Sequence, residues 1–115
     1  VNVLGVTFKE NCPDTRNSQV FSLIEALQGF GLKVSAVDPR ADASSVFDET
    51  GVQLKSVDEL EPAAATLLAV PHQELCDKGY KWMRSITKRP GIFIDLQAVF
   101  RESAADDKTL SYWSL

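Results

Sequence analysis

The chain has 115 residues, of which 44% are hydrophobic and 24% charged, and its formal net charge is -4. This balance is typical of one globular domain and excludes a disordered or fibrous chain, while the scattered lysines and arginines offer no basic stripe to nucleic acid. Cys12 and Cys76 lie far apart without a CxxC motif, and no apolar run approaches the ~20 residues of a membrane span, so we expect a cytoplasmic domain without zinc, export signal or membrane contact.

Four stretches are predicted to be strands, because each is a short apolar or alternating run bounded by turn or polar residues. In chain order they are residues 1–6, 33–38, 66–70 and 92–96. The first run begins at residue 1 without an initiator Met, which suggests a fragment of a longer protein. The tail, residues 101–115, is polar until Tyr112 and Trp113, which we expect to dock back on the body.

The spacing of four apolar residues predicts a helix with one buried face, because they recur at i, i+3, i+4 and i+7. These residues are Val20, Leu23, Ile24 and Leu27. Asn17 or Ser18 is the expected N-cap, and Gly29 or Gly31 is the expected end of the helix.

Two further helices are predicted before the last strand. Residues 56–59 have the spacing of a capping box, which starts a short helix that ends by Pro62. The second covers about residues 74–88 with a break near Gly79, after which Pro90-Gly91 turns the chain into the last strand.

The predicted order is strand, helix, strand, short helix, strand, helix, strand. This alternation predicts an α/β fold in which a mostly parallel sheet lies between two helical layers, because parallel neighbours need crossover connections. In such three-layer folds ligands bind beyond the carboxyl ends of the strands. Four places qualify here, namely residues 7–9, 38–40, 71–72 and 95–97.

The segment from Phe8 to Ser18 is the most informative of these places. It joins the first strand to the first helix and carries Lys9 and Arg16 beside a helix N-terminus, where free amides and two cations suit an anion. The spacing leaves open the alternative that Arg16 pairs with Asp14 and that Lys9 is merely solvated. The segment contains neither GxGxxG nor the P-loop pattern, so it is not a standard dinucleotide turn.

The remaining candidates have weaker support. Asp38 ends a strand where a dinucleotide-binding fold places an acid on ribose, but without the glycine fingerprint we favour a simple Asp38-Pro39 turn. Cys12 has only His72 as a potential base, and we favour a loop hydrogen-bonding role for that histidine over a catalytic pair. The sequence therefore predicts no catalytic residue and no metal ligands. Four large side chains are assigned to packing: Phe30, Trp82, Met83 and Phe93.

Residues 3–18 closely resemble the segment that opens the C-terminal domain of the UDP-glucose/GDP-mannose dehydrogenase family, and the resemblance covers essentially the whole chain. The matching residues are Gly5, Phe8-Lys9, Asp14, Arg16-Asn17-Ser18, Val37-Asp38-Pro39, Pro71-His72 and Ile94-Asp95. The form of the loop, residues 11–14, and the ending, residues 112–115, resemble the branch that oxidises UDP-N-acetylhexosamines for surface polysaccharides.

The resemblance implies that residues 1–115 are the UDP-sugar-binding domain of a longer NAD-dependent nucleotide-sugar 6-dehydrogenase. Enzymes of this family have two Rossmann-like, doubly wound domains joined by a long helix, with substrate and NAD in the cleft between them. They oxidise the sugar C6 alcohol to a carboxylate with two NAD and a cysteine from the half that precedes this domain. We therefore expect the chain alone to be inactive, its partners to be a UDP-sugar and the N-terminal NAD-binding domain, and the full-length protein to be a homodimer.

At the level of residues, the resemblance implies that Phe8 and Lys9 contact the UDP-sugar and that Arg16 reaches the NAD held by the other domain. The family usually has an Arg or Lys two residues after Asp95 for substrate contact. Here that position is Gln97, whose amide can hydrogen-bond but cannot neutralise charge.

Two other classes are weighed against this interpretation. A receiver-like signalling domain needs acids after its first strand, where this chain has Thr7-Phe8-Lys9. A purely structural or oligomerisation domain would bind no ligand.

Overall fold

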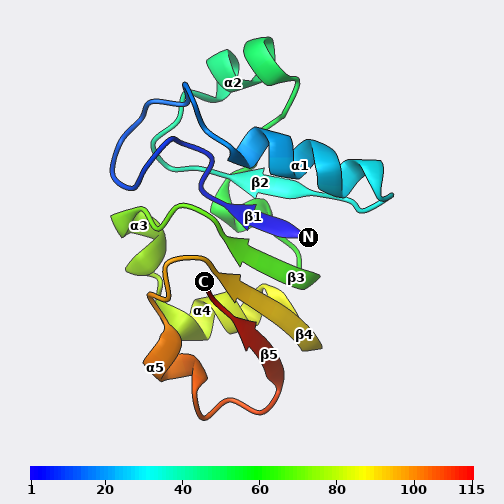
Figure 1. Cartoon of the computed structure of the whole chain (residues 1–115), viewed down its shortest axis with the longest axis vertical. Coiled ribbons are helices and arrows are strands. Elements are labelled where there is room, and N and C mark those ends of the chain that lie inside the picture. The colour runs from blue at the N-terminus through cyan, green and yellow to red at the C-terminus, as the bar shows by residue number, and fades with distance from the viewer.

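Five parallel strands form one sheet, with their carboxyl ends on the left in Figure 1. The computed structural model describes residues 1–115. The strands are β1 (Asn2–Leu4), β2 (Ser35–Val37), β3 (Ala63–Leu68), β4 (Thr87–Asp95) and β5 (Leu110–Trp113). Their order in the sheet is β2-β1-β3-β4-β5, so the chain winds outward in both directions from β1 and the strand order reverses between β1 and β3. The predicted α/β, doubly wound parallel sheet is confirmed.

Short helices connect the strands. They are α1 (Val20–Gly29), α2 (Ala43–Thr50), the 3-10 helix η1 (Val57–Glu59), α3 (Gln73–Cys76), α4 (Gly79–Ser85) and α5 (Arg101–Ala104). The predicted capping box is present, because the Ser56 backbone N–H donates to Glu59 Oε1 at 2.9 Å and lowers the pKa of that carboxyl. The predicted break falls at Gly79, whose φ of 80° separates α3 from α4. The longest helix, α1, has 10 residues, and no helix has the length and apolar character needed to span a bilayer.

Three elements have no counterpart in the sequence-based prediction: α2, α5 and β5. In α2 only Val46 is buried, so the helix carries no apolar stripe, and it starts where the Asp42 side chain accepts from the Ser44 backbone N–H. Strand β5 arises in the polar tail because it pairs with β4, with Tyr112 beside Phe93. The expected docking of the tail is thereby confirmed, and β5 is the last strand.

Several predicted boundaries differ from the observed ones. Helix α1 begins at Val20, and Gln19 before it makes no side-chain cap. The Ser18 hydroxyl accepts from the Val20 backbone N–H at 3.3 Å, so of the two predicted caps Ser18 serves the start of the helix and Asn17 does not. Residue 17 instead has a left-handed φ of 64° and ends the preceding loop. The second predicted helix, residues 74–88, ends at Ser85, and the predicted turn at Pro90-Gly91 lies inside β4.

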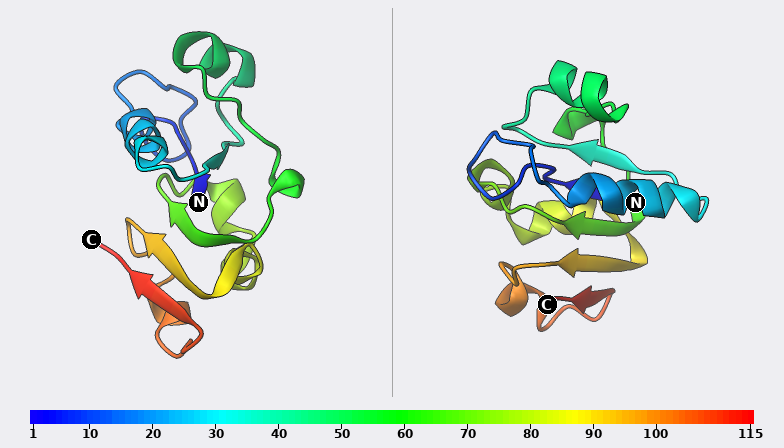
Figure 2. Two further views of the ribbon diagram at one scale, coloured as in Figure 1. Left: turned by 90° about the vertical axis from the view of Figure 1, so that its right-hand side faces the viewer. Right: turned by 45° about the horizontal axis from the view of Figure 1, so that its top comes forward.

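The core has two parts, one on each face of the sheet, because alternate residues of the strands point to opposite faces. On the face of α3, α4 and α5, Met83 and Phe93 are fully buried and Trp82 is partly buried, as predicted. The other part packs Ile24 of α1 against β1 and β3. Figure 2 shows in its left view that α1 covers only the upper part of its face and that no helix lies on that side of β4 and β5. Phe30 is exposed just beyond α1, so its assignment to packing is wrong.

Gly5 follows β1, and its lack of a side chain allows the backbone after β1 to lie close to the backbone after β3, where the strand order reverses. Its φ is 88°, and a Cβ on it would lie 2.4 Å from the Val70 carbonyl oxygen and 2.6 Å from Val70 Cβ. Its backbone N–H donates to the Val37 carbonyl at 2.8 Å. A side chain would therefore clash with backbone and also impose a strained dihedral.

We predict that Gly5→Ala lowers the free energy of unfolding by about 2 kcal/mol or more, because backbone strain and a backbone clash act together. Gly29→Ala is the matched control. Gly29 ends α1, and no atom lies within 4 Å of the position that its Cβ would take. This variant should be more stable by up to ~1 kcal/mol, because alanine has the higher helix propensity. Urea denaturation of both variants measures the difference. Equal midpoints for the two variants would contradict the close crossing at Gly5.

Candidate functional site

The loop between β1 and α1, residues 7–18, crosses the carboxyl ends of the neighbouring strands and is called the rim loop below. Thr7 is buried at the end of β1, Asp38 follows β2 and His72 follows β3. The side chains of Asp38 and His72 are both fully buried. In the sequence these three residues follow three separate predicted strands, and the order of the strands in the sheet brings them together.

Hydrogen bonds fix the state of the buried imidazole. The Asn11 backbone N–H donates to His72 Nδ1 at 2.9 Å, so Nδ1 carries no proton. His72 Nε2 lies 2.9 Å from Asp38 Oδ2 and 3.0 Å from Thr7 Oγ1. A carboxylate only accepts, and the Thr7 hydroxyl donates to the Lys9 carbonyl at 3.0 Å, so Nε2 carries the proton and donates. The imidazole is therefore neutral and ties the rim loop to the ends of β2 and β3.

The Asp38 carboxylate is fully used by this chain. Its Oδ2 accepts from the Val6 N–H at 2.7 Å and from His72, and its Oδ1 accepts from Arg40 N at 2.7 Å and Ala41 N at 2.9 Å. These donors compensate the burial of the charge. Asp38 therefore closes the turn after β2, as favoured from the sequence, and has no exposed oxygen for a ribose.

Asn11 and Arg40 hold the outer part of the rim loop. The Asn11 side-chain Oδ1 accepts from the Gln73 backbone N–H at 2.8 Å, at the start of α3. Arg40 donates to the Asn11 carbonyl at 3.3 Å and to Glu74 Oε1 at 3.1 Å. Neither residue is singled out by its position in the sequence as a site residue. The position of Arg40, three residues after the end of β2, was a usable signal. Nothing in the sequence indicated the left-handed backbone of Asn11, whose φ is 59°.

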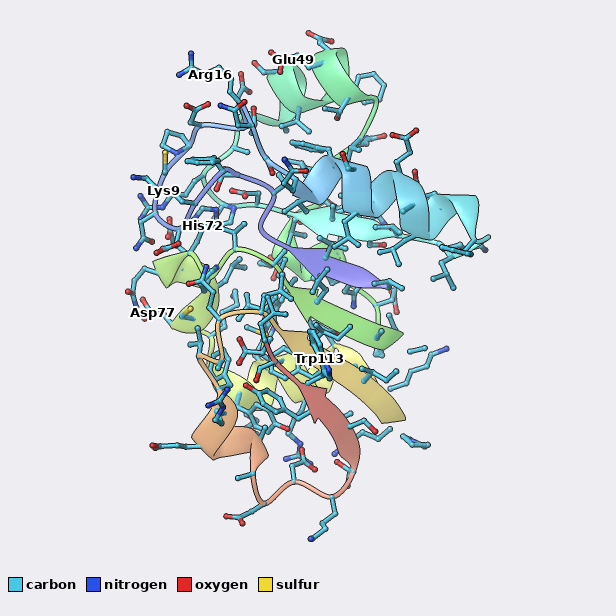
Figure 3. All side chains as sticks on the ribbon, in the orientation of Figure 1. Lys9, Arg16, Glu49, His72, Asp77 and Trp113 are labelled. Carbon is cyan, nitrogen blue, oxygen red and sulfur yellow. The ribbon has the colours of Figure 1, made fainter.

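Phe8 and Lys9 stand at the exposed turn of the rim loop. The Phe8 backbone N–H donates to the Asp14 carbonyl at 2.8 Å, which closes the loop at its base. The Phe8 ring is 56% exposed although its backbone is fixed. No ion pair involves Lys9, which lies on the left of Figure 3, on the side of the carboxyl ends of the strands. The loop therefore presents an apolar ring and a free cation from an ordered backbone.

Gln97 lies at the same rim. It follows β4 in a turn where Ala98 has a φ of 56°, and its Nε2 is 3.5 Å from Glu10 Oε2, at the limit of a hydrogen bond. The fold thus brings Gln97 beside the residue that follows Lys9, across 87 positions of sequence.

The turn that carries Gln97 is held by Asp95, which is fully buried. Its carboxylate accepts from Val99 N at 3.1 Å, Phe100 N at 2.7 Å and the Tyr112 hydroxyl at 2.8 Å. Burial, and then this hydrogen bond to Asp95, raise the pKa of Tyr112 to about 12. The docked tail therefore stabilises the Gln97 side of the rim.

Arg16 pairs with Asp14, which is the alternative that the spacing left open. The guanidinium donates through Nε to Oδ1 at 3.0 Å and through Nη2 to Oδ2 at 2.9 Å. These bonds, with one from the Arg16 backbone N–H, lower the pKa of Asp14 to about 2 and raise the pKa of Arg16. The Arg16 side chain remains 84% exposed, so the pair presents its charges to solvent.

Lys9 and Arg16 do not converge on one pocket within this chain. Figure 3 shows Arg16 at the upper end of the rim loop and Lys9 lower on the same side. The main surface hollows are lined by other residues. The expectation that both cations flank the start of one helix is therefore wrong for the chain by itself, because the rim loop separates them.

Cys12 has no base in this structure. Both ring nitrogens of His72 are engaged by Asn11, Thr7 and Asp38, so a Cys12–His72 pair does not form. No group of three or more His, Cys, Asp or Glu side chains is placed to hold a metal ion.

A doubly wound parallel sheet with a cation-bearing loop at the carboxyl ends of its strands places the chain in the class of α/β domains of the Rossmann-like type. The chain belongs to the UDP-glucose/GDP-mannose dehydrogenase family, because the family model described as its UDP binding domain matches residues 2–102.

Known relatives and solved structures agree with this assignment. The chain is 38% identical over 99 residues to Protein CapL of Staphylococcus aureus and 34% identical over 106 residues to the UDP-N-acetyl-D-glucosamine 6-dehydrogenase of Salmonella typhi. These matches cover 86% and 92% of this chain but only 23% and 25% of the relatives, so the chain spans about a quarter of their length. The UDP-N-acetyl-mannosamine dehydrogenase Cap5O of S. aureus shares the fold with a TM-score of 0.68 at 19% identity, over 98% of this chain and 25% of that one.

We predict that His72→Ala frees the rim loop as well as destabilising the domain. The change removes a buried side chain, leaves the Asn11 N–H without its acceptor and takes one of four donors from the Asp38 carboxylate, which together costs about 2–4 kcal/mol. Hydrogen exchange should accelerate most at the amides of residues 8–14, and urea denaturation should show the loss of stability. An unchanged exchange pattern in the rim loop would show that the imidazole does not hold it.

The Asp14–Arg16 pair predicts an acid-dependent contribution to stability. Because the pKa of Asp14 is lowered in the folded state from 3.8 to about 2, the contribution is complete above pH 3.8 and is lost as the pH falls toward 2. Carboxyl NMR titration should find Asp14 ionised to about pH 2 and returned toward its usual pKa by Arg16→Ala. Arg40→Ala is the control, since Arg40 pairs with Glu74, and should leave Asp14 unchanged.

Proposed function

We propose that the chain is the UDP-sugar-binding domain of an NAD-dependent nucleotide-sugar 6-dehydrogenase. The observation that carries this proposal is the rim loop, whose Phe8 and Lys9 are exposed and unengaged although buried contacts to His72 fix the backbone beneath them. The family model that matches the chain is described as a UDP binding domain, which supports a UDP-sugar as the ligand.

Each proposed substrate contact has a physical reason. The Lys9 ammonium neutralises the diphosphate of a UDP-sugar, and a cation that has no partner in the chain gives up no ion pair on binding. The exposed Phe8 ring offers an apolar face to the base or sugar ring. Gln97 adds an uncharged hydrogen-bonding group beside Glu10 at the same rim, and its amide favours a polar but uncharged part of the substrate.

This domain alone lacks the features of an NAD-binding site. It lacks the glycine fingerprint, and the carboxylate of Asp38, at the position of a ribose-binding acid, has both oxygens occupied by four donors of the chain. We therefore assign NAD to the N-terminal domain of the longer protein, with Arg16 as the residue that reaches it from this side. The pairing with Asp14 orients the Arg16 guanidinium toward solvent, from where it is able to meet a second domain.

The proposed reaction is oxidation of the C6 alcohol of a UDP-N-acetylhexosamine, or of UDP-glucose, to the uronic acid for surface polysaccharide synthesis. The relatives include UDP-N-acetyl-D-glucosamine 6-dehydrogenases, which favours the acetylated hexosamines. The role of this domain is to hold and orient the nucleotide sugar while the chemistry takes place on the other domain. The longer protein is proposed to be a cytoplasmic homodimer, and residues 1–115 alone are expected to be inactive.

We predict that the chain binds UDP-N-acetylglucosamine and that Lys9→Ala weakens this binding about tenfold or more, because a charge-assisted contact contributes roughly 1.5–3 kcal/mol. Calorimetric titration measures the affinity, and NMR shifts at residues 8, 9 and 97 locate the ligand. The matched control is Lys33→Ala, which removes the same charge from an exposed position at the amino end of β2.

Two results would refute the proposal in different ways. Equal weakening by Lys9→Ala and Lys33→Ala would mean that only the net charge matters. Reduction of NAD by the purified chain with any UDP-sugar would show that the chemistry is not confined to another domain.

A further inference from the structure

A polar hollow lies at the amino ends of β3, β4 and β5, at the opposite edge of the sheet from the rim loop. Its volume is about 530 Å³, and none of its seven lining residues is hydrophobic. Three of them are cations, Arg84, Lys88 and Arg89, and three carry hydroxyl groups, Ser85, Thr87 and Thr109. Strands β4 and β5 begin on the right of Figure 1, so the hollow lies on that side and the rim loop on the left. It is called the basic hollow below.

The junction between α4 and β4 brings the three cations together. Arg84 lies in the last turn of α4, and Lys88 and Arg89 are the second and third residues of β4. The buried Thr87 hydroxyl donates to the Met83 carbonyl at 2.8 Å, which holds the end of the helix against the start of the strand. This bond also occupies one of the last carbonyls of α4, which weakens the repulsion of an anion by the negative end of the helix. The backbone that carries the cations is therefore fixed.

The three cations have bonding capacity that the chain does not use. Lys88 and Arg89 are exposed and take part in no ion pair. Arg84 has one acidic neighbour, because its Nε lies 3.0 Å from Asp107 Oδ2, but this buried nitrogen has no aligned hydrogen-bond partner. The Asp107 carboxylate is also shared with Thr109, which donates to it through its backbone N–H and its hydroxyl. The basic hollow thus keeps a local positive charge in a chain whose net charge is -4.

The chemistry of the lining selects the class of ligand. Guanidinium and ammonium groups bind phosphate, and arginine does so through paired hydrogen bonds. The volume falls within the usual range of about 300–1,000 Å³ for small-molecule pockets, so there is room for more than a phosphate group. The lining offers a nucleobase no aromatic ring on which to stack. The hydroxyls of Ser85 and Thr109 donate within the chain and can still accept from the hydroxyl groups of a sugar.

We propose that the basic hollow binds a phosphorylated sugar, with the phosphate group held between Arg84, Lys88 and Arg89. A polar lining with three cations and three hydroxyl-bearing residues fits both parts of such a ligand. The site shares no residue with the rim loop and does not include Gln97, so its ligand does not take the place of the UDP-sugar proposed there.

NMR titration of the 115-residue chain tests the proposal, since the chain builds its two core clusters from its own residues. Glucose 1-phosphate, added at constant ionic strength, should shift the amide signals of residues 84–89 and 109. The double substitution of Lys88→Gln and Arg89→Gln should weaken this binding about tenfold or more, because it removes two charge-assisted contacts.

The matched control is the double substitution of Lys33→Gln and Lys55→Gln. It removes the same charge from two exposed positions beside β2, which is the edge strand farthest from β5. The affinity for glucose 1-phosphate should change less than about twofold, because screened charges on the surface interact weakly over such distances. Equal weakening in both double variants would overturn the proposal, since it would show that only the net charge matters.

Three comparison ligands test the proposed class of ligand through the same signals of residues 84–89. Inorganic phosphate should shift them but bind more weakly than glucose 1-phosphate, and glucose should not shift them. Uridine monophosphate should bind there no more tightly than inorganic phosphate. Equal affinities for glucose 1-phosphate and inorganic phosphate would overturn the assignment of a sugar. Shifts confined to residues 8–18 would overturn the site itself, because they would place the phosphate at the rim loop.

Discussion

The neutral imidazole of His72 is the interaction on which the rim of this domain depends. It lies fully buried between the Asp38 carboxylate, which follows β2, and two groups of the rim loop, the Thr7 hydroxyl and the Asn11 backbone N–H. A buried imidazole is retained only where both ring nitrogens have partners, and here those partners are the strand ends and the rim loop themselves. Satisfying one buried ring therefore fixes the backbone that presents Phe8 and Lys9.

A rigid backbone beneath exposed side chains is what a binding surface requires. When a ligand binds a flexible loop, the loop must become ordered, and the entropy lost in that step reduces the affinity. In the rim loop that ordering is already achieved by the closure at the Phe8 N–H and by the contacts of Asn11 to α3. Asp95 and Tyr112 order the turn that carries Gln97 in the same way. The two sides of the rim are thus held independently.

The uncovered parts of the molecule suggest a domain that is completed by another body. Lys9 and Arg16 face solvent at separate places on the rim loop, and Ile92 and Trp113 leave an apolar strip of β4 and β5 in contact with water. A polar rim and an apolar strip of this size are compatible with one folded domain, because the two core clusters are complete without them. The exposed cations of the rim loop fit the proposed position of a second domain at the rim.

The sequence predicted the elements whose apolar residues carry a period or a turn signal: the first four strands in chain order, α1 from the stripe that includes Ile24, and η1 from its capping box. It also identified the rim loop and the family, because those depend on residue types at fixed spacing. It did not predict β5 or α2, since an edge strand and a surface helix bury too few side chains to leave a pattern. Only the tertiary structure decided that His72 and Asp38 form one buried network and that Arg16 pairs with Asp14 away from Lys9. For the buried network the physical reason is that strand order brings together residues more than thirty positions apart, and local spacing contains no information about that order. For Arg16 the spacing allowed both a pair with Asp14 and a free side chain, and only the loop conformation decides between them.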